Sequence, residues 1–212
     1  YIMTNSSQGI EVYKWDAEKQ KHVQYCKATK AHNGTPQVYD IDNDGTPEIL
    51  SGFNVLSNKC EKIYISTYGY SYHTPAVGNF DNDPSGIASL MRNNGIWKWD
   101  TANKKWVQKL KISGTLHNAY ADFGTPGATA AEFDYNKLDG YPEFVFSGSG
   151  KLLLYASYQK EDGTLSAQQL MSVSGFTRGG PITIGDFNND GLPEIGLASS
   201  GVFGVYDPKC KA

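Results

Sequence analysis

The stretch DIDNDGTPE, residues 40–48, places acidic side chains at its first, third, fifth and ninth positions and glycine at its sixth. This spacing points the carboxylates to one side of a tight loop, and the glycine permits the sharp turn that wraps the chain around an ion. Without a cation, acids packed this closely would repel one another. The stretch therefore predicts an oxygen-lined loop suited to Ca²⁺, with the backbone carbonyl of the seventh residue, Thr46, as a further ligand.

Three further segments of the chain repeat this pattern of acids and glycine. The four segments read VYDIDNDGTPEIL, VGNFDNDPSGIASL, AEFDYNKLDGYPEFV and IGDFNNDGLPEIGL, starting at Val38, Val77, Ala131 and Ile184. Their first loop positions are Asp40, Asn79, Asp134 and Asp186. The spacing leaves room for about four short strands in each unit, which is what a blade of a β-propeller requires.

Alternation of apolar and polar residues at period two marks strands around the loops. Glycine-led aromatic segments at residues 9–16, 95–100 and 201–207 carry it, and no window shows a sustained helical period. The 23 glycines and 14 tyrosines also suit short strands joined by tight turns. The sequence therefore predicts an all-β fold, a β-propeller of about four repeat blades. We expect the aromatic residues of these strands to pack between blades: Tyr13, Trp15, Trp97, Trp99, Phe203 and Tyr206.

We expect a single propeller region over residues 1–212, divided into units by turns that end in proline. The units are residues 1–33 (later strands of a preceding blade), 34–73, 74–123 and 124–178 (three blades) and 179–212 (the start of a further blade). In the unit at 124–178 the turn Gly124-Thr125-Pro126 stands further from its loop than in the others. Because both ends of the chain carry second and third strands, we favour a portion of a larger propeller over a compact four-bladed ring.

The four loops differ in how closely they keep the pattern. Residues 186–194 match residues 40–48, with Asn188 supplying a neutral oxygen. The loop at Asp134 has one extra residue, and the loop at Asn79 has Ile87 in the ninth position, where the others have glutamate. The bland alternative is a set of Asx-rich turns, but four loops in register favour metal binding. The candidate ligands are Asp40, Asp42, Asp44, Thr46 and Glu48; Asn79, Asp81 and Asp83; Asp134, Asn136, Asp139 and Glu143; Asp186, Asn188, Asp190, Leu192 and Glu194.

At these loops the chain resembles the FG-GAP or VCBS-type repeats of integrin α-subunit-like propellers. The resemblance implies calcium-binding loops that stiffen the connections of the blades, a closed ring of about seven blades, and an extracellular or lumenal location. The family residues carry over at Asp40, Asp42, Asp44, Glu48, Asp186, Asn188, Asp190 and Glu194. Further blades of the same or a longer chain would complete the ring.

Charge, hydropathy and cysteine content limit the partners. The net charge of −3 does not suit binding to nucleic acid or to an anionic membrane, and no apolar run can span a bilayer. Cys26, Cys60 and Cys210 allow at most one disulfide within the chain. A Cys26–Cys60 bridge would leave Cys210 for an outside partner, and three unpaired cysteines are the alternative.

No catalytic motif is present, so we predict a non-catalytic, calcium-stabilised extracellular or cell-surface module for adhesion, assembly or ligand binding. Its partners would be another extracellular protein or a glycan. The alternatives are a lectin-like propeller and the propeller domain of a carbohydrate-active enzyme such as a polysaccharide lyase. Four tyrosines between residues 64 and 72 form a candidate sugar-stacking patch, and His32, His73 and Arg178 could share a ligand-binding surface.

Overall fold

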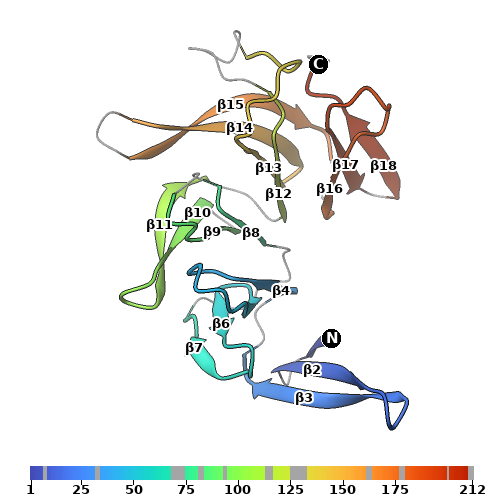
Figure 1. Cartoon of the computed structure of the whole chain (residues 1–212). Helices are drawn as coiled ribbons and strands as arrows, with labels where there is room; N and C mark the ends of the chain where they lie inside the picture. The colour runs from blue at the N-terminus through green and yellow to red at the C-terminus, as the bar shows by residue number, and fades with distance from the viewer. Residues whose placement is uncertain are drawn as a thin grey trace.

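The chain is an assembly of antiparallel β-sheets in the computed structural model, which describes residues 1–6, 9–31, 34–67, 75–80, 84–92, 95–112, 117–124, 133–160, 164–176, 180–199 and 201–209. Every extended regular element in these ranges is a β-strand, and the strands form five sheets (Figure 1). The all-β class is therefore confirmed. No helix in the described part of the chain is long and apolar enough to cross a membrane.

We name the sheets in chain order. The first contains β1 (Ile2–Ser6), β2 (Gly9–Asp16) and β3 (Lys21–Thr29). The second contains β4 (Pro36–Tyr39), β5 (Glu48–Ser51), β6 (Asn54–Leu56) and β7 (Lys62–Tyr64). The third contains β8 (Ala76–Gly78), β9 (Ser89–Arg92), β10 (Gly95–Asp100) and β11 (Lys105–Lys111). The fourth contains β12 (His117–Ala121), β13 (Glu143–Gly148), β14 (Lys151–Gln159) and β15 (Leu165–Ser174). The fifth contains β16 (Ile182–Gly185), β17 (Glu194–Ser199) and β18 (Val202–Tyr206).

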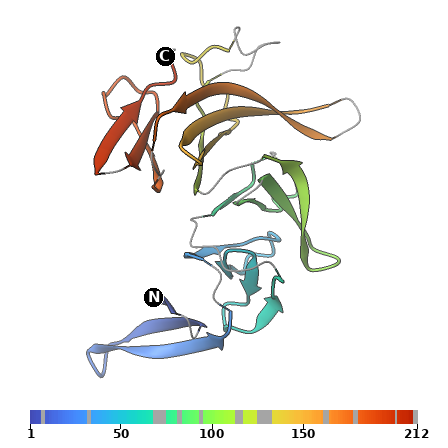
Figure 2. The ribbon, with the colours of Figure 1, turned by 180° about the vertical axis from the view of Figure 1, so that it is seen from behind.

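Each sheet is a meander in which strands adjacent in the sequence pair with one another. The five sheets follow each other along a curved array, from the first near the N-terminus to the fifth near the C-terminus (Figures 1 and 2). First strands of neighbouring sheets approach each other, since β12 contacts both β8 and β16. The described sheets do not close into a ring, so the propeller remains a prediction.

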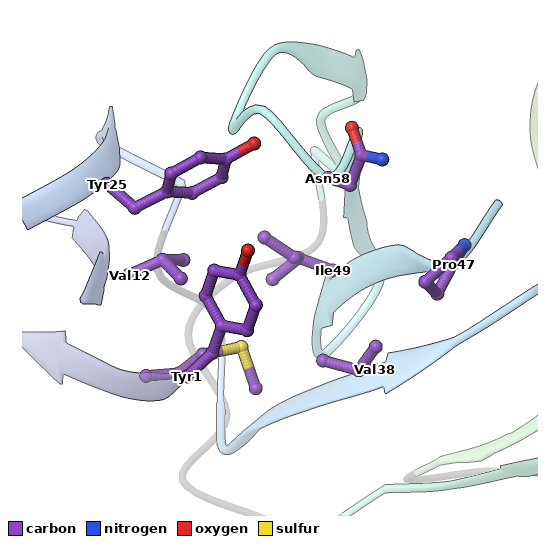
Figure 3. A pocket seen from close by; sticks show the side chains of 8 residues that line it. Tyr1, Val12, Tyr25, Val38, Pro47, Ile49 and Asn58 are labelled. Carbon is purple, nitrogen blue, oxygen red and sulfur yellow. The ribbon is translucent and has the colours of Figure 1, made fainter. Parts of the chain in front are cut away.

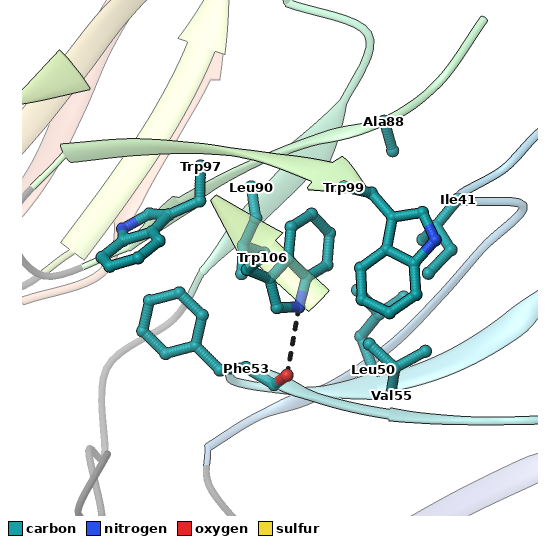
Figure 4. Packing of buried hydrophobic residues seen from close by; sticks show 9 residues of the cluster. All are labelled: Ile41, Leu50, Phe53, Val55, Ala88, Leu90, Trp97, Trp99 and Trp106. Atoms are coloured by element: carbon teal, nitrogen blue, oxygen red, sulfur yellow. Dashed lines mark hydrogen bonds between the residues drawn. The ribbon is translucent and has the colours of Figure 1, made fainter. Parts of the chain in front are cut away.

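The apolar core lies between consecutive sheets. Between the second and third sheets, the three tryptophans Trp97, Trp99 and Trp106 are buried against Leu50 and Phe53 (Figure 4). The indole Nε1 of Trp106 donates a hydrogen bond to the carbonyl oxygen of Phe53 at 3.1 Å, which satisfies its one polar atom. The expected packing of strand aromatics between blades is thus met at Trp97 and Trp99.

The aromatics at the two ends of the array behave differently. Trp15 on β2 and Phe203 on β18 are 57% and 54% exposed. These strands belong to the first and fifth sheets, each of which has a neighbouring sheet on one side alone in the described structure. The expectation that Trp15 and Phe203 are buried between sheets is therefore wrong for this structure.

Glycine begins the aromatic strands for a steric reason. Gly95 at the start of β10 has a φ of 143°, and a Cβ there would lie 1.7 Å from the carbonyl oxygen of Leu110. Gly9 at the start of β2 has a φ of 137°, and its Cβ would lie 2.0 Å from the carbonyl oxygen of Ala28. In both hairpins the partner strand passes too close for any side chain.

A disulfide joins the first and second sheets. Cys26 on β3 is bonded to Cys60, which follows β6, with a Cα–Cα distance of 5.7 Å. The bridge borders a cluster that contains Val12 of the first sheet and Ile49 of the second. The predicted Cys26–Cys60 pairing is confirmed, and Cys210 lies outside the described residues.

One unit boundary differs from the sequence prediction. The fourth sheet begins with β12 at His117, within the range 74–123 that we assigned to the preceding blade. We placed the boundary at the proline turn of residues 124–126. That turn follows β12 in the chain, whereas the other proline turns stand at or before the start of the first strand of their sheet. The loop after β12 is consequently much longer than its counterparts.

Candidate metal sites

The first loop, residues 40–48, connects the first strand of the second sheet to its second strand. The carboxylate of Asp40 accepts hydrogen bonds from the backbone N–H groups of Asp44 at 3.1 Å and Gly45 at 2.8 Å. Asp44 accepts one from the N–H of Thr46 at 2.7 Å, and Glu48 accepts one from the N–H of Ile41 at 3.1 Å. These bonds engage both oxygens of Asp40 and one oxygen each of Asp44 and Glu48, and they hold the loop in a tight coil.

The fourth loop, residues 186–194, repeats these contacts in the fifth sheet. Asp186 accepts from the N–H groups of Asp190 at 3.1 Å and Gly191 at 2.9 Å. Asp190 accepts from Leu192 at 2.9 Å, and Glu194 accepts from Phe187 at 2.7 Å. The fourth and sixth residues of both loops have positive φ, between 59° and 87°, which explains asparagine and glycine at those positions.

The third loop starts at Asp122, which the sequence analysis missed. Asp122 follows the last residue of β12 as Asp40 follows β4, and its Oδ2 accepts from the N–H of Gly140 at 2.6 Å. Glu143 accepts from the N–H of Phe123 at 2.7 Å, and Asp139 accepts from the N–H of Tyr141 at 2.9 Å. These match three of the four contacts described in the first and fourth loops, so Asp122 occupies the first position.

The assignment of Asp134 to the first position is therefore wrong. Asp134 is exposed, and its Oδ1 accepts from the N–H of Asn136 at 3.0 Å in a local Asx turn. The residues between Phe123 and Asp134 form an insertion that separates the first position from the rest of the loop. A signal was present in the sequence, because Asp122-Phe123 repeats Asp186-Phe187, but the insertion hid the alignment.

The second loop lies partly outside the described residues. Asn79 follows β8 as Asp40 follows β4, while Asp81 and Asp83 fall in the part of the chain that is not described. Sheet register pairs Ser89 with Gly78, as Glu48 pairs with Tyr39. Ser89, and not Ile87, therefore takes the glutamate position, and this loop lacks the acid that the other three have.

The acids of the first loop destabilise one another's charge. Oxygens of Asp40, Asp42 and Asp44 lie within 4.8 Å of one another. Burial, and then the charges of Asp44 and Asp40, raise the pKa of Asp42 above its ordinary value. Burial raises the pKa of Glu48 to about 6, although the N–H of Ile41 opposes the shift. A bound cation would relieve both effects.

In the third loop, the pKa of one carboxyl group, that of Glu143, is raised further than that of Glu48. Glu143 is 3% exposed, and burial raises its pKa to about 8, with the charges of Asp139 and Asp122 adding to the shift. The hydrogen bond from Phe123 acts in the opposite direction. An ionised Glu143 at neutral pH therefore calls for a positive partner in the loop.

Two buried carboxylate oxygens support a cation in the continuous loops. Oδ1 of Asp42 and Oε1 of Glu194 are buried and have no hydrogen-bond partner among the described residues. Glu194 is 2% exposed, and its other oxygen is already bonded to the N–H of Phe187. Asp186, Asp190 and Glu194 bring oxygens within 4.8 Å of one another. The residues present thus fit a hard divalent cation with oxygen ligands.

Lys209 distinguishes the fourth loop from the first. Its Nζ pairs with Asp190 Oδ2, and this hydrogen bond holds the pKa of Asp190 below its ordinary value. The charges of Asp207 and Glu194 also act on Lys209. The fourth loop therefore has a side-chain ammonium beside one of its candidate ligands, and we find no such ion pair at the first loop among the described residues.

Most residues of the other two candidate surfaces lie outside the described part of the chain: His32, His73, Arg178 and the tyrosines at 68, 70 and 72. Tyr64, the remaining member of the aromatic patch, is half-buried, and its ring packs edge-on against Trp99 at a centroid distance of 6.3 Å. This contact gives Tyr64 a packing role between the second and third sheets.

Comparison with known proteins agrees with the loop geometry. Residues 134–197 match the family model described as FG-GAP-like repeat. The chain carries an FG-GAP-like repeat. The match includes the last part of the third loop, from Asp134 to Glu143, and the whole of the fourth, and the same pattern of acids and glycine recurs in the second sheet at residues 40–48. No curated protein sequence matches the chain.

A solved structure shares the fold over almost the whole chain. The V. cholerae biofilm matrix protein Bap1 superposes with a TM-score of 0.59 and 13% sequence identity, over 96% of this chain. At that identity the likeness concerns the fold. The chain spans 34% of the length of Bap1, so the array of five sheets corresponds to about a third of that structure.

Proposed function

We propose that the chain is a calcium-stabilised, non-catalytic propeller module that acts in extracellular adhesion or assembly. The observation that carries the calcium role is the buried oxygen of Glu194, which has no partner among the described residues, together with a second such oxygen on Asp42 in the first loop. Leaving a buried carboxylate oxygen without a partner is costly, and a Ca²⁺ ion held by Asp186, Asp190 and Glu194 would remove that cost. Calcium would add its binding free energy to the stability of the folded state.

The extracellular setting has two supports. The Cys26–Cys60 disulfide is a bond that persists in oxidising compartments. The FG-GAP-like repeat and the fold shared with a biofilm matrix protein are consistent with a secreted adhesive or scaffolding module. The curved array of sheets supports the propeller architecture, in which further blades would continue the array.

The test is thermal unfolding of the chain with excess Ca²⁺, with excess Mg²⁺ and with a chelator. We expect calcium to raise the unfolding midpoint by several degrees and magnesium to have little effect, because Mg²⁺ gives up its waters reluctantly. Asp40→Ala and Asp186→Ala should each remove part of the rise. Glu18→Gln, at an exposed turn outside the loops, is the matched control and should keep it. A cooperative transition that calcium does not move would contradict the proposal.

A further inference from the structure

The second loop lacks the acid that ties the two ends of the other loops together. In those loops the glutamate at the end of the loop accepts a hydrogen bond from the N–H of the residue after the first position. The pairs are Glu48 with Ile41, Glu143 with Phe123 and Glu194 with Phe187. In the second loop Ser89, which has no carboxylate, stands in the place of the glutamate. Other contacts therefore have to hold the end of this loop.

The first loop supplies two such contacts across the junction between the second and third sheets. The backbone carbonyl oxygen of Ile41 accepts a hydrogen bond from the N–H of Ala88 at 2.9 Å. The side-chain Nδ2 of Asn43 donates a hydrogen bond to the carbonyl oxygen of Ser85 at 3.1 Å. Ser85 and Ala88 belong to the last part of the second loop, directly before β9. The first loop thus holds the second at the stretch where the glutamate is missing.

The two loops approach each other closely at Asn43. Gly86 in the second loop has a φ of 74°, and a Cβ there would lie 2.7 Å from Nδ2 of Asn43. Asn43 itself has a φ of 59°, in a left-handed region that asparagine tolerates better than most side chains. The contact therefore suits asparagine on one side and glycine on the other.

A chain of hydrogen bonds runs from a candidate ligand of the first loop into the third sheet. Glu48 accepts the N–H of Ile41 at 3.1 Å, and the carbonyl of Ile41 accepts the N–H of Ala88. The carbonyl of Ala88 in turn accepts the N–H of Trp99 on β10 at 3.1 Å. Ile41, Ala88 and Trp99 share one buried cluster (Figure 4), where water does not compete for these bonds. The position of the first loop is therefore coupled to β10 by hydrogen bonds as well as by packing.

We propose that the first loop serves two sheets: calcium bound there also holds the second loop and the third sheet in place, with Asn43 as the positioning residue. Asn43 lies between the candidate ligands Asp42 and Asp44, whose oxygens come within 4.8 Å of each other and of Asp40. A cation held by these acids would restrict the backbone of Asn43 and so fix the amide that reaches Ser85. This inference rests on the proposed calcium role and adds to it the dependence of one loop on its neighbour.

The two loops differ in how much each relies on the other. Residues 40–48 hold one another through four internal hydrogen bonds. The described end of the second loop is bonded to residues outside it, since Ile41 and Asn43 hold it from the second sheet. From β10, Nζ of Lys98 donates to the carbonyl oxygen of Ile87 at 2.6 Å. The first loop can therefore keep its shape without the second, whereas the end of the second depends on the first.

The experiment is hydrogen exchange of individual backbone amides, followed by NMR with Ca²⁺ and with a chelator. The N–H of Gly45, bonded to Asp40, reports on the first loop, and the N–H of Ala88 reports on the junction. Calcium should slow the exchange of both amides in the parent chain. Asn43→Gly keeps the positive φ without strain and removes the bond to the second loop. It should retain the effect at Gly45 and reduce the protection of Ala88 about five- to tenfold.

Asn189→Gly is the matched control. Asn189 takes the same position in the fourth loop with a φ of 62°, and its side chain makes no hydrogen bond in the described part of the chain. This variant should leave both amides unchanged, and an equal loss at Ala88 would refute the inference. Calcium protection at Gly45 but not at Ala88, or full protection of Ala88 in Asn43→Gly, would refute it and leave the calcium role intact. No calcium protection at either amide would overturn both.

Discussion

The first and third loops build three matching contacts from different sequences. In the first, nine consecutive residues bring Asp40 to Gly45 and Glu48 to Ile41. In the third, Asp122 reaches Gly140 and Glu143 reaches Phe123 across an insertion. The end of the first strand and the start of the second are fixed by the sheet register in both cases. A loop of this type is therefore defined by the two strands that it joins, and the residues between them can vary in number.

Because the third loop starts at Asp122, replacing Asp122 should lower the stability of the chain more than replacing Asp134. This is the largest effect that we expect. Asp122→Ala leaves the N–H of Gly140 without its acceptor and should cost about 1–2 kcal/mol, or roughly 3–8 °C in the unfolding midpoint with calcium present. Asp134→Ala removes an exposed Asx turn and should cost less than about 2 °C. Differential scanning calorimetry of both variants, with Asp40→Ala as the reference, measures the contrast.

The contrast would fail if Asp134→Ala were the more damaging change. In that case the loop would begin at Asp134, as the continuous sequence suggests, and the contact between Asp122 and Gly140 would be incidental.

A second, smaller effect is the pH dependence of stability, to which the third loop should contribute more than the first. Burial gives Glu143 a folded-state pKa of about 8 and Glu48 one of about 6, both above the ordinary value of 4.5. Because the folded state disfavours the ionised form, the free energy of unfolding of the chelated chain should fall as pH rises from 4.5 towards these values. Glu143→Gln should remove about 2–4 °C of the decline up to pH 8, and Glu48→Gln a smaller part that ends near pH 6.

Calcium should abolish this pH dependence, since a bound cation favours the ionised carboxylates. The check is a series of unfolding midpoints across pH for the parent and both variants, with and without the ion. A parent chain whose chelated form gains stability over that interval would show that neither glutamate is held in its neutral form.

The smallest expected effect compares the fourth loop with the first. Lys209 pairs with Asp190, so a cation must displace or share that ammonium. Lys209→Ala should tighten calcium binding at the fourth loop about two- to fivefold, because an exposed ion pair is weak. Isothermal titration calorimetry on a background that carries both Asp40→Ala and Asp122→Ala isolates that loop, and Lys19→Ala, from an exposed pair remote from the loops, is the control. Unchanged affinity in Lys209→Ala would mean that the ammonium does not compete.

Much of the architecture follows from local patterns in the sequence. The all-β class follows from period-two alternation and glycine-led strands, and the steric reason is visible at Gly9 and Gly95. The loops at residues 40–48 and 186–194 follow from contiguous spacing, and their backbone contacts repeat almost bond for bond. The Cys26–Cys60 pairing was one open possibility that the approach of the first two sheets settled.

The tertiary structure decided what depends on register between distant segments. Asp122 is 18 residues from Gly140 in the sequence and 21 from Glu143, so only the pairing of β12 with β13 brings these residues together. Ser89 takes the ninth position for the same reason, since register sets which residue faces Gly78. A pocket at Val38 and Ile49 is lined by residues of the first and second sheets together, which lie far apart in the sequence (Figure 3). Spacing along the chain fixes local loops and turns, whereas cavities and split sites exist only once separate strands are aligned.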